Sequence, residues 1–122
     1  MRVLVIDDDE IFCRLLVEIL DQVGIKAACR TDGLNAYDLL DRESYDLCII
    51  DVRMPLILGS DLAEAIKENH PQMKIILASA FPDQALKDYA RRKGILLLAK
   101  PFTKLQLFDT VRSALGESVG RN

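Results

Sequence analysis

The sequence of 122 residues has no tryptophan, a single histidine and three cysteines, and only 6% of its residues are aromatic. Cys13, Cys29 and Cys48 are widely spaced and form no CxxC motif or Cys/His pair. This spacing argues against a zinc site or a disulfide framework, and we expect reduced cysteines that pack as small apolar residues. The lone His70 is expected at the surface. We therefore expect a functional site built from residues other than cysteine and histidine.

Long apolar runs are also missing. The longest runs fall far short of the roughly 20 residues that a membrane span needs. The N-terminus lacks the long apolar region and small-residue cleavage site of a signal peptide. We therefore expect a cytoplasmic protein with no membrane contact.

Charges of both signs are spread along the chain, and the net charge is −3. This balance gives no indication of a basic surface for nucleic acid or anionic membrane. We expect no direct nucleic-acid binding by this domain. The expected partners are proteins or small anions.

Short apolar runs alternate with longer segments of helical period along the whole chain, and 50% of the residues are hydrophobic. This alternation predicts one (βα)₅ domain of the α/β class, with a doubly wound, flavodoxin-like parallel sheet in strand order 2-1-3-4-5. The domain is expected over 1–116, and 117–122 is a tail where a linker could begin. The predicted strands are Arg2–Ile6, Ile25–Cys29, Leu47–Ile50, Lys74–Ala78 and Ile95–Ala99.

The helical segments carry apolar residues at helical spacing, and polar residues suited to capping stand at their starts. The first helix is expected to bury Ile11, Leu15, Ile19 and Val23, and the last one to bury Leu105, Phe108, Val111 and Leu115. Glycines are expected to end several helices. The expected start signals are Thr31-Asp32-Gly33, Gly59-Ser60-Asp61, Pro82-Asp83 and the capping box Thr103 with Gln106.

Polar side chains follow four of the five predicted strands. Asp7, Asp8 and Asp9 follow the first, Asp51 the third, Ser79 the fourth and Lys100 the fifth. In an open parallel sheet, ligands bind beyond the carboxyl ends of the strands, where the connections diverge. With the order 2-1-3-4-5, this point lies between strands one and three. The sequence therefore predicts a carboxylate cluster there.

Crowded carboxylates repel one another, and a divalent cation relieves this repulsion. Because the donors are all oxygen, we expect Mg²⁺, with Mn²⁺ as the alternative. Such a site suits phosphoryl transfer, with Asp51 as the nucleophile and with Lys100 and Ser79 supplying charge and a hydrogen bond. Capping of the following helix is an equal alternative for Asp9 and Asp7.

The motifs at these positions resemble those of one known family. They are Asp7-Asp8 after an apolar strand, Asp51-Val52-Arg53-Met54-Pro55 with Gly59 following, Ser79-Ala80, and Lys100-Pro101-Phe102. In their order and spacing they are similar to the receiver domain of two-component response regulators, with its chemotaxis-regulator-like fold. The resemblance covers essentially the whole chain.

The resemblance implies a phosphorylation-dependent signalling switch. Asp51 would accept a phosphoryl group from a sensor histidine kinase or a phosphotransfer protein, and the product would be slowly autodephosphorylated. Asp8 and Asp51 would bind Mg²⁺ directly, Asp7 through water, and Arg53 through its main-chain carbonyl. Ser79 and Lys100 would contact the phosphoryl group, and the Lys100–Pro101 bond would be cis. No other enzymatic activity is implied.

One position departs from the family pattern, because Leu97 stands where an aromatic switch residue is usual, three residues before the lysine. This departure is the one feature on the side of a second hypothesis, a receiver-like interaction module that works without phosphorylation. The intact set of site residues argues against that hypothesis, namely Asp7, Asp8, Asp51, Ser79 and Lys100. A small-molecule phosphatase is a third, although Arg53 stands where its general acid would be. Output would run through a downstream protein target or an effector domain outside this chain, and a dimer through the last two helices is a further hypothesis.

Overall fold

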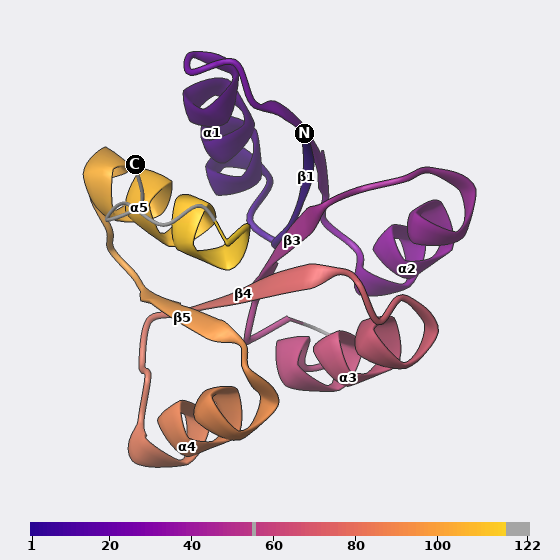
Figure 1. Ribbon diagram of the computed structural model, residues 1–122, viewed down its shortest axis with the longest axis vertical. Coiled ribbons are helices and arrows are strands. Elements are labelled where there is room, and N and C mark those ends of the chain that lie inside the picture. Colours follow the sequence, from indigo (N-terminus) through magenta and orange to yellow (C-terminus); the bar gives the residue numbers. More distant parts are fainter. Residues whose placement is uncertain (55, 117–122) are drawn as a thin grey trace.

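The computed structural model describes residues 1–54 and 56–116 and consists of a sheet with helices on both faces (Figure 1). Its strands are β1 (Arg2–Ile6), β2 (Lys26–Arg30), β3 (Leu47–Asp51), β4 (Lys74–Ser79) and β5 (Leu96–Ala99). Its helices are α1 (Glu10–Asp21), α2 (Gly33–Arg42), α3 (Gly59–Asn69), α4 (Gln84–Lys93) and α5 (Lys104–Ala114). Each predicted strand is present, with ends shifted by at most one residue.

The five strands are parallel and lie in the order β2-β1-β3-β4-β5. Helices α1 and α5 cover one face, and α2, α3 and α4 cover the other (Figure 1). The predicted flavodoxin-like architecture is therefore confirmed. In register, Ile6 of β1 lies opposite Ile50 of β3, so the residues that follow these two strands emerge side by side.

The central strands are buried on both faces, which explains why their sequences lack polar alternation. Every residue of β3 is buried, and residues 3–6 of β1 are at most 1% exposed. Two apolar layers result, one on each side of the sheet. The acidic residues at the strand ends thus project from a tightly packed support.

Helix starts follow the predicted capping signals at four of the five helices. The side chains of Asp9, Asp32, Asp83 and Thr103 each accept a hydrogen bond from a backbone N–H of the following turn. The capping box of Thr103 and Gln106 is complete. These caps satisfy donors that a helix N-terminus otherwise leaves unpaired.

The start of α3 is different, because its N-cap Leu58 makes no side-chain hydrogen bond. Instead, Gly59 packs directly on the end of β3, and its N–H donates to the carbonyl of Val52 at 2.8 Å. A Cβ at Gly59 would lie 2.2 Å from the carbonyl oxygen of Asp51. Only glycine permits this approach.

The predicted buried faces of α1 and α5 are wrong in part. Ile11, Leu15 and Val23 are 82%, 50% and 51% exposed, and Leu105 is 65% exposed. The predicted Val111 is buried, and Ile19, Phe108 and Leu115 pack against the core. The other residues that these helices bury are Cys13, Leu16 and Leu20 of α1 and Leu107 of α5. Both helices carry more apolar residues than one face can bury, so the correct face is shifted around the axis from the predicted one.

Two predicted features fall on positions outside the described residues, namely Pro55 and the tail 117–122. Within the described ranges, none of the helices has the length and hydropathy that crossing a bilayer requires. The three cysteines are free, as expected.

Candidate functional site

Three aspartates meet beyond the carboxyl ends of β1 and β3. Asp7 and Asp8 follow β1, and Asp51 is the last residue of β3. Each of the three offers a carboxylate oxygen, and these oxygens all lie within 4.8 Å of one another. Asp7 is 2% exposed and Asp51 9%, whereas Asp8 is open to solvent. The predicted cluster is therefore formed by the strand order.

Lys100 follows the edge strand β5, and its side chain reaches back to this cluster. Its Nζ lies 2.8 Å from Oδ2 of Asp7 and 3.2 Å from Oδ1 of Asp51. Its backbone N–H donates to the carbonyl of Ser79 at 2.8 Å, and the Lys100–Pro101 peptide bond is cis, as expected. The ammonium group thus bridges the two buried carboxylates.

Phe12 is a member of this site that the sequence did not reveal. The Lys100 ammonium lies 4.4 Å from the centroid of the Phe12 ring, within the range of a cation–π interaction. The ring also meets Phe102 edge to face, with centroids 5.7 Å apart and an interplanar angle of 72°. In the sequence Phe12 is one of many apolar residues of α1, so only its contact with Lys100 distinguishes it.

The charged groups of this site shift the pKa values of Asp51 and Lys100. Burial, and then the charge of Asp7, raise the pKa of Asp51, although Lys100 opposes them. Burial alone would lower the pKa of Lys100, but its hydrogen bonds and charge interactions with Asp7 and Asp51 outweigh burial and raise it. A single ammonium therefore leaves the pocket with surplus negative charge. An all-oxygen donor set in this state fits a hard divalent cation.

The remaining predicted residues lie at the same edge of the sheet with different roles. Asp9 Oδ1 accepts the N–H of Phe12 at 3.1 Å, so capping is what Asp9 does in this structure. Ser79 is 4% exposed, and its Oγ accepts the N–H of Phe81 at 3.0 Å. Arg53 is exposed, two residues beyond Asp51. Leu97 is partly buried and packs into the layer beneath α2, α3 and α4.

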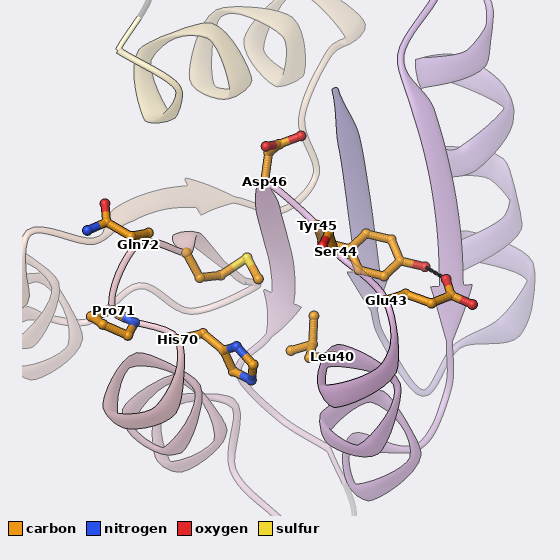
Figure 2. A pocket seen from close by; sticks show the side chains of 9 residues that line it. Leu40, Glu43, Ser44, Tyr45, Asp46, His70, Pro71 and Gln72 are labelled. Atoms are coloured by element: carbon orange, nitrogen blue, oxygen red, sulfur yellow. Dashed lines mark hydrogen bonds between the residues drawn. The ribbon is translucent and has the colours of Figure 1, made fainter.

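A second hollow of about 360 Å³ lies at the opposite end of the sheet, between the loops that precede β3 and β4 (Figure 2). His70 lines it together with Tyr45 and Glu43, whose side chains are hydrogen bonded to each other at 2.9 Å. The His70 Nε2 lies 3.2 Å from Oδ1 of Asp41. His70 thus lies at the surface, partly buried by its neighbours.

The fold and the acidic pocket define a class of α/β protein, and sequence comparison identifies it. Residues 3–112 match the family model of the response regulator receiver domain. The chain belongs to this family, and it is a receiver domain of phosphorylation-dependent two-component signalling. The resemblance seen in its motifs is confirmed.

Relatives differ in how much of their own length this chain spans. The response regulator receiver protein CpdR of Brucella abortus is 30% identical, with 93% of this chain and 96% of CpdR covered. The autoinducer 1 sensor kinase/phosphatase LuxN of Vibrio harveyi is also 30% identical over 98% of this chain, which spans only 14% of LuxN.

Among solved structures, the response regulator protein TrrA of Thermotoga maritima is 29% identical and has a TM-score of 0.83, with 93% of this chain and 98% of that chain covered. That protein was crystallised in complex with Mg²⁺ and beryllofluoride.

Proposed function

We propose that Asp51 accepts a phosphoryl group from a phosphohistidine and that the domain slowly removes this group again. The observation that carries the proposal is the position of Asp51. It is 9% exposed, its carboxylate stands within 4.8 Å of those of Asp7 and Asp8, and Lys100 Nζ lies 3.2 Å away. A nucleophile flanked by a cation site and a fixed ammonium suits phosphoryl transfer.

The transfer step needs no general acid. A carboxylate oxygen of Asp51 attacks phosphorus, and the new P–O bond forms as the P–N bond to the donor imidazole breaks. The imidazole leaves with the bonding pair, and it leaves neutral because its other ring nitrogen already carries a proton. Lys100 supplies positive charge to an equatorial phosphoryl oxygen. Hydrolysis then follows when water attacks phosphorus, which releases inorganic phosphate and restores the carboxylate.

A bound Mg²⁺ would neutralise the equatorial phosphoryl oxygens, and Mn²⁺ is the alternative ion. Asp8 and Asp51 would be direct ligands, Asp7 a ligand through water, and the main-chain carbonyl of Arg53 the remaining protein donor. Asp8 suits direct binding because it is open to solvent. Asp7 suits an indirect role because Lys100 already holds it at 2.8 Å.

Ser79 would respond to phosphorylation. Its hydroxyl already accepts a hydrogen bond from Phe81, so its own proton is available to donate to a phosphoryl oxygen. Moving toward that oxygen would draw the loop after β4 inward. Leu97 on the neighbouring strand would then transmit the change through packing rather than through a swinging aromatic ring.

The phosphodonor would be a sensor histidine kinase or a phosphotransfer protein. Exposed Ile11 and Leu15 give the first turns of α1 an apolar surface beside Asp8, which a helical donor could cover. We propose that output passes to a downstream protein or to an effector domain outside this chain, without direct nucleic-acid contact by this domain. A dimer through α4 and α5 and a cytoplasmic location complete the proposal.

The test is to incubate the protein with Mg²⁺ and acetyl phosphate and to measure its intact mass. We expect the mass gain of one phosphoryl group in the wild type, a much smaller gain without Mg²⁺, and none in Asp51→Asn. Asp32→Asn is a matched control, because Asp32 caps α2 and Asn is an equally good cap. It should be phosphorylated like the wild type.

The interaction-module alternative predicts a different result. If the wild type gains no phosphoryl group and shows no Mg²⁺-dependent binding of beryllofluoride, the phosphorylation proposal fails and the alternative, favoured by Leu97, replaces it.

A further inference from the structure

Two of the three cysteines meet between α1 and β2, away from the acidic pocket. Cys13 lies on the buried face of α1, and its Sγ points at the sheet backbone, 3.5 Å from the carbonyl oxygen of Val5 and 3.8 Å from that of Arg30. Val5 is the register partner of Cys29 on β2. The Cys13 thiol is therefore directed at the backbone of β1 and β2 next to Cys29.

The two cysteines are neighbours where α1 packs on the sheet. Cys29 stands beside Val5 in register, and the Cys13 Sγ lies 3.8 Å from the Arg30 carbonyl oxygen, one residue beyond Cys29. Burial, followed by the nearby Cys29 side chain, raises the pKa of Cys13 to about 12. Both residues belong to the same apolar layer, which α1 and α5 form with the sheet. Cys48 belongs to the opposite layer, so the sheet separates it from this pair.

The two cysteines differ in access to solvent. Cys13 is fully buried, whereas Cys29 lines a surface hollow of about 580 Å³ together with Arg14, Glu18 and Arg30. Arg30 folds back onto this strand, with its Nη1 donating to the carbonyl of Cys29 at 2.8 Å. Cys29 is partly exposed and Cys13 is buried. A partly exposed thiol beside a buried one suits a reaction in which peroxide oxidises the first and the second then forms a disulfide with it.

We propose that Cys13 and Cys29 form a reversible redox pair, in which a peroxide oxidises Cys29 and the product is an internal disulfide. In the first step the Cys29 sulfur attacks one peroxide oxygen, the O–O bond breaks, and sulfenic acid and water form. In the second step the Cys13 sulfur displaces that oxygen as water, its thiol proton leaving with it. Overall, two thiols and one peroxide give one disulfide and two waters.

The disulfide would tie α1 to β2. The disulfide would act on the neighbourhood of the acidic pocket. Helix α1 begins directly after the acidic residues, and it carries Phe12 next to Cys13 in the sequence. The proposal does not depend on phosphorylation of Asp51, and the two tests have separate readouts.

The experiment oxidises the reduced wild-type protein with a small molar excess of hydrogen peroxide, alkylates the remaining thiols and digests the product with trypsin without reduction. Trypsin places Cys13 in the peptide 3–14, Cys29 in 27–30 and Cys48 in 43–53. We expect peptides 3–14 and 27–30 to be joined, a single alkylated thiol at Cys48, and recovery of all three thiols after dithiothreitol.

Matched variants assign the order of the steps. Cys13→Ala should leave a Cys29 sulfenic acid that dimedone captures, Cys29→Ser should give no disulfide, and Cys48→Ser should behave as the wild type. The wild-type digest tests the proposal even if a variant fails to fold. Three alkylated thiols after peroxide treatment, or a link that includes Cys48 or joins two chains, would overturn the proposal.

Discussion

Asp51 carries its charge in surroundings that oppose it. It is 9% exposed, and burial and Asp7 together raise its pKa. Lys100 compensates in part, but the same ammonium is shared with Asp7. An ionised Asp51 is therefore a cost to the stability of the fold that the proposed phosphoryl transfer would require, a common property of reactive side chains.

The first prediction is that Asp51→Asn stabilises the metal-free protein near neutral pH. In the folded protein the pKa of Asp51 is raised above its ordinary value of 3.8. The loss of folding stability from ionising Asp51 is therefore absent below pH 3.8 and grows as the pH rises through the folded pKa. Asparagine removes the charge and keeps the shape, and Lys100 keeps Asp7. We expect a gain of about 1 kcal/mol in the free energy of unfolding.

The measurement is urea unfolding in EDTA near pH 7 and again at about pH 4, where much of the difference should vanish. Asp38→Asn on the exposed side of α2 is the control, with little change expected. A variant less stable than the wild type near pH 7 would mean that the Lys100 contact outweighs burial.

At this scale the sequence identified the charged groups of the site and missed its aromatic member. Asp51 and Lys100 could be predicted because each directly follows an apolar strand, and the carboxyl ends of parallel strands form the edge where ligands bind. Phe12 could not, because its role arises from a contact between the first turn of α1 and the loop after β5. Nothing near Phe12 in the sequence indicates that contact.

Among the elements, α1 and α5 show where periodicity alone fails. In α1, Ile11, Leu15 and Ile19 are spaced as regularly as the buried residues Cys13, Leu16 and Leu20. Two helical stripes therefore compete, and the sequence does not indicate which one faces the sheet. Caps are local, and four of them were predictable from a single polar side chain in the turn before each helix.

The start of α3 supplies the second prediction. Gly59→Ala would put a methyl group 2.2 Å from the Asp51 carbonyl oxygen and 2.8 Å from the Cα of Val52. The neighbours are backbone atoms, so α3 must move away from β3. We expect a loss of about 2 kcal/mol in the free energy of unfolding, together with weaker phosphorylation of Asp51.

Urea unfolding and the acetyl phosphate assay measure the two effects. Ser60→Ala is the adjacent control, because it changes a partly exposed residue of the same helix turn and should alter neither quantity by much. Wild-type stability in Gly59→Ala would show that α3 has room to adjust.

For the whole molecule, the strand order is what assembles the site. Asp7, Asp51 and Lys100 are far apart in the sequence, and they meet because β1 lies beside β3 and because Lys100 spans the distance from β5. The order was predictable, because the alternating pattern admits few topologies and because charged residues gather after strands one, three and five. Distances within the site were not predictable.

The third prediction follows from the charge gathered at this edge. Mg²⁺ should stabilise the folded protein, because the unfolded chain does not hold the three carboxylates together. At ten times the dissociation constant the gain is about 1.4 kcal/mol, and EDTA removes it. Thermal unfolding against Mg²⁺ concentration measures the effect.

Asp51→Asn serves here as the variant that lacks one ligand, and its response to Mg²⁺ should be much weaker. Equal stabilisation of both proteins would place the ion elsewhere on the molecule.

The bridge that Lys100 makes between Asp7 and Asp51 has a consequence for the order of events. Three carboxylates and one ammonium give the pocket a net charge of two negative units when all are ionised. An incoming phosphoryl group is itself an anion and is repelled. A divalent cation brings the net charge to zero. If the proposed phosphorylation takes place, we therefore expect it to require both the bound cation and the phosphodonor.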